Sequence, residues 1–326
     1  MALTILLFVL GLIVIIKGGD WFVDAAVWMA EITGVPKLLI GATVVSVATT
    51  LPELFVSVLA VLDGAVSLGV GNAVGSVICN TGLILALSLL IRPSRVENRF
   101  FYVKAGILAA ALALLYLMVL DKQLGVWESL VLITVFVVFF GLNIYYAKKM
   151  GTKRQCDNLE AEKTRTGANV LKFIAGAAGI VIGARLLVSS GTAIAAALGV
   201  SDGIIGLTIV ALGTSLPELV TTVTALRKKQ CELGLGNIIG ANVMNLAVIL
   251  PVCSLMSGGL KLESSYLPAL RWVTTQSLSI DLPVAALLIA LLIVPPVLLK
   301  GKMPRLQGIL MITVYVAYIV FLALNL

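Results

Sequence analysis

Two short polar segments, each ending in a glutamate, are the part of this sequence best suited to chemistry. The first reads TTLPE from Thr49 to Glu53, and the second reads TSLPE from Thr214 to Glu218. Proline removes a backbone N–H and crowds the preceding turn, so a helix that carries either segment should bend or break there and free carbonyl oxygens. Carboxylate, hydroxyl and carbonyl oxygens together suit a hard cation. The two segments therefore predict a cation site.

A second pair of segments adds neutral oxygens to this set. One reads GNAVGSVICN from Gly71 and the other reads GNIIGANVMN from Gly236, and both contain a GxxxG spacing that favours close helix packing. Their other notable positions recur every four residues, so in each segment they lie on one face of a helix. These positions are Asn72, Ser76 and Asn80 in the first segment, and Asn237, Ala241 and Asn245 in the second.

The ligand types favour calcium over other metals. Calcium accepts six to eight oxygens in a flexible cage, whereas magnesium requires a tight octahedron, and two glutamates match the double charge of calcium. The chain has no histidine, and its four cysteines have no CxxC spacing. Soft metals, haem with histidine ligands and most acid–base enzymology therefore lack their usual residues.

A carboxylate left unpaired in lipid costs roughly 3 kcal/mol or more, so Glu53 and Glu218 need a reason to be there. Lys17 and Arg185 are the only basic residues at a comparable depth, and a buried ion pair or a protonated, merely packed glutamate is the alternative to ion binding. The same acid at two equivalent positions favours ion binding. A solvated or capping role is expected for the remaining aspartates near span ends, namely Asp20, Asp24, Asp63, Asp121, Asp202 and Asp281.

The elements that carry these segments are membrane helices. Of the 326 residues, 60% are hydrophobic and 12% are charged, which is too apolar for an ordinary soluble domain. A spanning helix needs roughly 20 apolar residues. Residues 1–16 carry no basic start or cleavage site, so we expect a retained first helix. About ten spans are predicted, near residues 3–27, 37–61, 67–91, 101–120, 124–147, 169–190, 203–226, 232–257, 276–299 and 306–325.

An internal repeat relates the two halves of the chain. A shift of 165 residues aligns IGATVVSVATTLPEL with IGLTIVALGTSLPEL, with nine identities in fifteen positions, and the same shift aligns the two GN segments. We predict an all-α integral membrane protein of about ten transmembrane helices in two inverted five-helix repeats, because an odd number of spans reverses the second copy. The repeats would occupy residues 1–147 and 168–326, with a linker at 148–167.

The distribution of basic residues predicts the orientation of the chain. One set of alternate loops, which includes the linker, holds 18 lysines and arginines, and the opposite set holds three. Positively charged short loops stay in the cytoplasm. We therefore expect a multi-pass protein with a cytoplasmic linker and both termini outside. The net charge of +7 follows from this topology, and nothing beyond it supports a nucleic-acid partner.

These paired segments resemble the signature regions of the sodium/calcium exchanger family of the cation/calcium exchanger superfamily, and more closely its prokaryotic inner-membrane calcium/sodium antiporter branch. The resemblance covers nearly the whole chain and rests on TSLPE-type and GNxxG-type segments that occur together in an inverted repeat. It implies a ten-helix antiporter of the inner membrane, whose repeats surround a central site for transported calcium and sodium ions.

The resemblance also implies a set of ligands. Glu53 and Glu218 would be the central carboxylates that calcium and sodium share. The remaining ligands would be the side chains of Thr49, Thr50, Ser76, Asn80, Thr214, Ser215 and Asn245, with backbone carbonyls near Ser46 and Ala211. Many relatives have serine in place of Ala241, and some have aspartate in place of Asn245, so the stoichiometry and any potassium dependence stay open.

Three other functions compete with sodium/calcium exchange. A proton/calcium exchanger would protonate the two glutamates, but the extra hydroxyls favour sodium because a proton needs no oxygen cage. A cation channel would require a continuous polar lining or a ring of subunits. An intramembrane enzyme would require a nucleophile with a nearby base, and none is visible. The expected partners are calcium, sodium and the lipid bilayer, with no cofactor and no obligatory protein partner.

Overall fold

The computed structural model describes residues 2–96, 99–151, 166–197, 211–262, 265–267 and 272–324. Helices dominate these residues, and nine helical stretches within them are long and apolar enough to cross a membrane. The described residues therefore have the predicted helical fold, with helices of the length and polarity that membrane spans require. The described strands form only three short antiparallel pairs, β1 with β6, β2 with β3, and β4 with β5.

The nine stretches agree with nine of the ten predicted spans. They lie at Ala2–Thr33, Lys37–Leu62, Leu68–Ile91, Phe100–Met118, Val126–Lys149, Thr166–Gly191, Cys231–Ser257, Ser277–Leu298 and Arg305–Ala323. The remaining prediction, residues 203–226, lies partly outside the described residues, which include only its later part. Hydropathy locates these helices well because lipid requires a continuous apolar surface.

The chain divides into two compact units that do not follow the two sequence halves. The first unit comprises Met1–Thr49 and Phe140–Gly240, and the second comprises Thr50–Phe139 and Ala241–Leu326. Each unit therefore takes residues from both predicted repeats. The predicted repeats at residues 1–147 and 168–326 rest on sequence similarity and stay a prediction. The two units, by contrast, are defined by which residues pack together.

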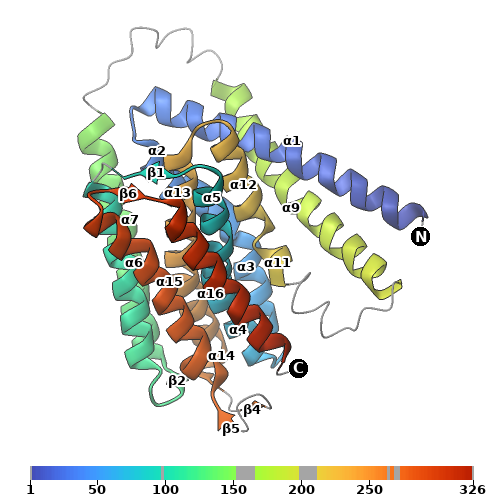
Figure 1. The fold of residues 1–326 in the computed structure, drawn as a ribbon, viewed down its shortest axis with the longest axis vertical. Coiled ribbons are helices and arrows are strands. Elements are labelled where there is room, and N and C mark those ends of the chain that lie inside the picture. Colours follow the sequence, from blue (N-terminus) through green and yellow to red (C-terminus); the bar gives the residue numbers. More distant parts are fainter. Residues whose placement is uncertain are drawn as a thin grey trace. The chain divides into compact units, whose positions relative to one another are not determined.

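Long helices dominate the first unit (Figure 1). Its elements are α1 (Ala2–Thr33), α2 (Lys37–Ile40), the π-helix η1 (Gly41–Val45), the start of α3 (Ser46–Leu62), the end of α7 (Val126–Gly151), α9 (Thr166–Ala197), α11 (Ala211–Thr214), α12 (Leu216–Arg227) and most of α13 (Cys231–Met244).

Helices α1 and α9 lie side by side (Figure 1). Their backbones approach each other closely at glycines. A Cβ atom added to Gly18 would lie 2.8 Å from the backbone nitrogen of Ile180, and one added to Gly176 would lie 2.6 Å from that of Phe22. Small residues of this kind let transmembrane helices pack closely where lipid supplies no hydrophobic drive. Buried apolar side chains around this contact form the core of the unit: Ile15, Phe22, Val23, Ala26, Ala30, Ile40, Val45, Ile180, Ala184, Ala225 and Leu233.

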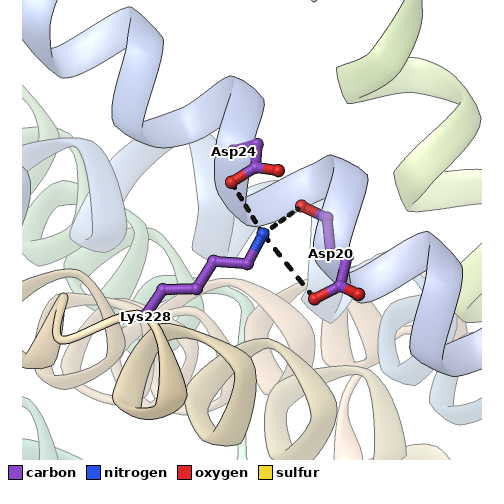
Figure 2. A network of polar contacts seen from close by, with 3 residues as sticks. All are labelled: Asp20, Asp24 and Lys228. Atoms are coloured by element: carbon purple, nitrogen blue, oxygen red, sulfur yellow. Dashed lines mark hydrogen bonds and ion pairs between the residues drawn. The ribbon is translucent and has the colours of Figure 1, made fainter.

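A polar contact ties the end of α12 to the middle of α1. Figure 2 shows Lys228 pointing toward two aspartates on α1: its Nζ donates to the Asp24 carboxylate at 2.7 Å and to the Asp20 carbonyl oxygen at 3.1 Å. The Asp20 carboxylate is 3.6 Å from the same nitrogen. These aspartates therefore neutralise a lysine, and the contact is partly exposed, so its contribution to stability is small.

The second unit contains the remaining helices and all the described strands. Its elements are most of α3 and α7, α4 (Val66–Cys79), the π-helix η2 (Asn80–Leu85), α5 (Ala86–Ile91), β1 (Ser94–Arg95), α6 (Arg99–Met118), β2 (Gln123–Leu124), the end of α13, the π-helix η4 (Asn245–Ile249), α14 (Leu250–Ser257), β3 (Leu260–Lys261), β4 (Ser265–Leu267), β5 (Trp272–Thr274), the π-helix η5 (Ser277–Asp281), α15 (Leu282–Leu298), β6 (Lys302–Met303) and α16 (Arg305–Ala323).

Asp281, at the end of η5, departs from the expectation of a solvated aspartate. It is 3% exposed, and it accepts hydrogen bonds from the Tyr318 hydroxyl at 3.1 Å and from the Gln276 amide at 3.4 Å. Its side chain makes no capping bond to α15. The expectation was wrong because position near a span end does not reveal that α16 supplies a polar partner.

Candidate cation site

The predicted ligands divide between the two units. The first unit holds Thr49, Thr214, Ser215 and Glu218, and the second holds Thr50, Glu53, Ser76, Asn80 and Asn245. Both glutamates are 0% exposed. Such complete burial of a carboxylate within an apolar helix is expensive unless the surroundings compensate, which marks both positions as functional candidates.

The glutamate of the second unit lies inside a continuous helix. Residues Ser46–Leu62 form α3 without interruption, with Pro52 inside it and Glu53 next in sequence. The expected break is therefore absent at this proline, although its missing N–H still deprives the Ala48 carbonyl of the usual helical donor. The irregularity appears earlier, in the π-helix η1 that directly precedes α3.

A neighbouring asparagine holds this part of α3. The amide nitrogen of Asn72 on α4 donates to the Glu53 carbonyl oxygen at 3.3 Å and to the Ser57 hydroxyl at 2.9 Å. Asn72 thus bridges the glutamate's backbone and a buried hydroxyl one turn later on the same helix. The sequence placed Asn72 on the polar face of its helix but did not identify Ser57.

Asn80 and Asn245 present their amide oxygens in a similar way. The Asn80 amide nitrogen donates to the Asn242 oxygen at 3.1 Å, the Asn242 nitrogen donates to the Thr81 hydroxyl at 2.8 Å, and the Asn245 nitrogen donates to the Ala241 carbonyl at 3.1 Å. The Oδ1 atoms of Asn80 and Asn245 are buried and accept no hydrogen bond from a described residue. Fixed nitrogens with available oxygens are what an amide ligand of a hard cation requires.

Each of these two asparagines also begins a π-helix. Asn80 is the first residue of η2 and Asn245 the first residue of η4. A π-helical turn displaces the backbone from the regular hydrogen-bond ladder and is frequent at functional sites. Because the two positions are equivalent in the repeat, the irregular turns support a shared role for the two asparagines.

The glutamate of the first unit lies at a helix start. Helix α11 ends at Thr214, Ser215 adopts φ −87° and ψ 4°, and α12 begins at Leu216 with Pro217 and Glu218 in its first turn. The predicted interruption is therefore present in this copy. The positive end of the α12 dipole stabilises a negative charge at Glu218, an effect that Glu53 lacks in mid-helix.

Thr49 is held by the GN segment of α13. Its buried hydroxyl donates to the Asn237 side-chain oxygen at 3.1 Å and lies 3.3 Å from the Ser46 carbonyl oxygen. Two glycines allow this close approach, because a Cβ at Gly236 would collide with the Leu38 carbonyl and one at Gly240 with the Ser46 hydroxyl. The predicted glycine packing is confirmed for this pair, whereas Gly71 and Gly75 in the first copy face open space among the described residues.

The basic residues named as possible ion-pair partners do not fill that role. Lys17 and Arg185 are both exposed, and neither forms an ion pair with a described residue. Among the described residues no three cysteines, aspartates or glutamates lie close enough to hold a metal together. A cation bound here would therefore depend on hydroxyl, amide and carbonyl oxygens as well as carboxylate.

Comparison with known proteins decides the family. The family model described as sodium/calcium exchanger protein matches residues 3–145 and 168–324. The chain belongs to the sodium/calcium exchanger protein family. The resemblance to this family is therefore confirmed, and so is the assignment to a family of membrane transport proteins. The match leaves out only the linker region and the chain ends.

Individual proteins from several organisms match along most of the chain. An uncharacterised membrane protein of Methanocaldococcus jannaschii is 32% identical over 98% of this chain and 97% of its own. The inner membrane protein YrbG of Escherichia coli is 35% identical over 79% of this chain and 82% of its own. A sodium/calcium exchanger of Methanosarcina acetivorans is 29% identical over 97% of each chain.

Solved structures of a sodium/calcium exchanger share the fold. The exchanger NCX_Mj, soaked with 10 mM Na⁺ and zero Ca²⁺, superposes with a TM-score of 0.83 at 30% identity, covering 98% of both chains. The same exchanger soaked with 2.5 mM Na⁺ and 10 mM Sr²⁺ gives the same TM-score. The described helices therefore have the fold of a multi-pass membrane exchanger of this family.

Three residues that form hydrogen bonds at this site were not predicted from the sequence: Asn242, Thr81 and Ser57. Asn242 corresponds to Val77 in the first repeat, and Thr81 corresponds to Leu246 in the second. Repeat symmetry therefore gave no signal for either. Ser57 does correspond to another hydroxyl residue, Thr222, so comparison of the repeats beyond the TSLPE segments could have found this pair.

Proposed function

We propose that the protein is a secondary active antiporter that exchanges calcium for sodium across the cytoplasmic membrane by alternating access. The observation that carries the proposal is the pair of repeat-related, fully buried glutamates, Glu53 and Glu218, on the helices of two matching TTLPE and TSLPE segments. The oxygens of Asn80 and Asn245, fixed by bonds to their nitrogens, support it.

The mechanism is competition for the carboxylates. One calcium ion or several sodium ions neutralise the two glutamates, and the neutral hydroxyls of Thr49, Thr50, Ser76, Thr214 and Ser215 would serve as further oxygen ligands. Moving a net charge through an apolar layer is unfavourable, so only the ion-loaded site passes between the two faces of the membrane. The empty, doubly charged site cannot change the side of the membrane that it faces. After the site releases calcium on one side, it must therefore bind sodium before it can return, and the two ions are exchanged.

The proposed architecture is two inverted five-helix repeats at residues 1–147 and 168–326, with the linker 148–167 in the cytoplasm and both termini outside. An inverted repeat is a common plan of secondary transporters, in which one repeat or bundle moves against the other around a central site. The nine described spans and the repeat in the sequence support this architecture.

The test is calcium-45 uptake by proteoliposomes that contain the wild-type protein. We expect uptake into sodium-loaded vesicles when the outside contains choline, and little uptake when sodium is equal on both sides. Uptake driven equally by a proton gradient without sodium would replace this proposal by a proton/calcium exchanger. Absence of calcium movement under every gradient would contradict calcium as a substrate.

A further inference from the structure

Two repeat-related asparagines have different hydrogen-bond partners. Asn72 and Asn237 occupy equivalent positions in the two GN segments. Asn72 binds its own repeat: its amide nitrogen donates to the Glu53 carbonyl at 3.3 Å and to the Ser57 hydroxyl at 2.9 Å. We refer to this pair of bonds as the clamp, because it fixes the glutamate-bearing helix over one turn.

Asn237 does not form the clamp of its own repeat. Its side-chain oxygen instead accepts the hydroxyl hydrogen of Thr49, which belongs to the opposite repeat, at 3.1 Å. Its amide nitrogen is buried and has no hydrogen-bond partner among the described residues. The hydroxyl oxygen of Thr222, which is equivalent to Ser57, is likewise buried without a described partner.

The second repeat therefore contains a buried donor and a buried hydroxyl that match a clamp formed only in the first. Buried polar atoms are almost always satisfied in proteins, and exceptions call for an explanation such as a second conformation. Alternating access in a transporter built from inverted repeats moves one repeat or bundle against the other, and the two repeat-related segments can exchange their local arrangements when the site faces the opposite side. With the arrangements exchanged, the Glu218 carbonyl and the Thr222 hydroxyl would be the clamp partners of the Asn237 nitrogen, by the equivalence of positions in the repeat.

We propose that Asn72 and Asn237 exchange partners during transport, so that the clamp forms in one repeat at a time. The inference rests on the proposed function, because it requires two states that face opposite sides. Both asparagines act as positioning residues and need not touch the transported ion.

The exchange also links the clamp to a proposed sodium ligand. A hydroxyl that binds a cation through its oxygen must point its hydrogen at an acceptor. In the described state, the side-chain oxygen of Asn237 is the acceptor for the Thr49 hydroxyl. When Asn237 moves to form the second clamp, Thr49 loses this acceptor. Once Asn237 leaves, the Ser46 carbonyl at 3.3 Å is the remaining acceptor for the Thr49 hydroxyl, so the direction in which this hydroxyl points changes between the two states.

The test uses the two clamp hydroxyls, because each acts in only one state. Ser57→Ala removes an acceptor from the described state, and Thr222→Val removes the matching acceptor from the opposite state. The measurement is the half-saturating calcium concentration on each face of the membrane, from calcium-45 exchange in proteoliposomes of known protein orientation. The ratio of the two values reports the balance between the two states.

We expect the two variants to move this ratio in opposite directions, each by roughly fivefold, as the loss of one hydrogen bond implies. Ser57→Thr and Thr222→Ser keep a hydroxyl and give each repeat the residue of the other, so both should retain the wild-type ratio. These conservative variants also separate the clamp from a defect in folding.

Shifts in the same direction, or an unchanged ratio in both variants, would overturn the partner exchange. The same holds if the conservative variants move the ratio as far as Ser57→Ala and Thr222→Val do. If the wild-type protein exchanges no calcium for sodium, the proposed function fails first, and that outcome is distinct from an unchanged ratio in an active transporter.

Discussion

Asn80 and Asn245 owe their proposed role to what their amide nitrogens do. Each nitrogen donates to a protein oxygen, so the oxygen of each amide is oriented before an ion arrives. An ion that binds to oriented ligands does not have to order them, which is the general advantage of preorganisation. For Asn80 the orienting residue is Asn242, which itself is fixed by Thr81.

Asn242→Leu tests this orientation at the scale of one residue. The substitution removes the acceptor of the Asn80 nitrogen without changing any proposed ligand. We expect the half-saturating calcium concentration to rise about fivefold, because a net contribution of about 1 kcal/mol from one hydrogen bond is lost. The measurement is calcium-dependent exchange in proteoliposomes.

Ser254→Ala is the matched control for Asn242→Leu. Ser254 is also buried and donates to the Leu124 carbonyl at 2.6 Å, but among the described residues it forms no hydrogen bond with a proposed ligand. The Ser254→Ala substitution should lower the thermal stability of the protein and leave its calcium affinity unchanged. Equal changes in affinity for the two variants would show that Asn242 has no specific role in positioning Asn80.

At the scale of elements, the α1–α9 contact depends on glycine. A Cβ at Gly18 would lie 2.8 Å from the backbone of α9, closer than real Cβ contacts allow, so Gly18→Ala forces the two backbones apart. Overpacking of this kind costs about 1–3 kcal/mol. We expect a lower melting temperature in detergent, measured by thermal unfolding.

Gly106→Ala is the corresponding control in the membrane helix α6. A Cβ at Gly106 meets no described atom within 4 Å, and alanine favours a helix more than glycine does. Its melting temperature should equal or exceed that of the wild type. A similar loss of stability in both variants would mean that the close packing at Gly18 is not what stabilises the contact.

Elements were predicted from sequence with unequal success. Apolar runs in the sequence predicted nine spans, and most of the predicted ends lie within a few residues of the observed ends. The bilayer fixes the length and polarity of a span, so hydropathy identifies it. The π-helices η2 and η4 were not predicted, since no residue type in these segments marks the wider turn of a π-helix. Pro52 was expected to bend or break its helix; α3 continues through it without a break, whereas the helix is interrupted directly before Pro217 in the second copy.

At the scale of the whole molecule, the orientation of the chain is open to a direct test. Cys156 lies in the basic linker, so with the other three cysteines replaced we expect a membrane-impermeant maleimide to label it in inside-out vesicles and not in right-side-out vesicles. Asp121→Cys, combined with replacement of Cys156, places a thiol in an opposite loop and should give the reverse result. Labelling of Cys156 in right-side-out vesicles would contradict the predicted topology.

The repeat was predicted from sequence, whereas the packing units were not. Identities between the two halves show common descent of the segments around Glu53 and Glu218. Nothing in those identities reveals that the packing units divide the chain near Thr49, Phe139 and Gly240 instead of at the linker. Contacts between residues far apart in sequence set the units, and such contacts leave no periodic pattern. The motifs in the sequence predict the candidate ligands, but they do not predict the residues that orient those ligands, such as Asn242 and Thr81.

The measurement that tests the account most directly is sodium-driven calcium-45 uptake by Glu53→Gln and Glu218→Gln beside the wild type. Glutamine keeps the size of each side chain and removes its charge, so each variant should fall to the background of empty liposomes. Asp63→Asn, which changes an exposed acid near a span end, should retain the wild-type rate. Sodium-dependent uptake at the wild-type rate in either glutamine variant would contradict exchange at a shared carboxylate pair.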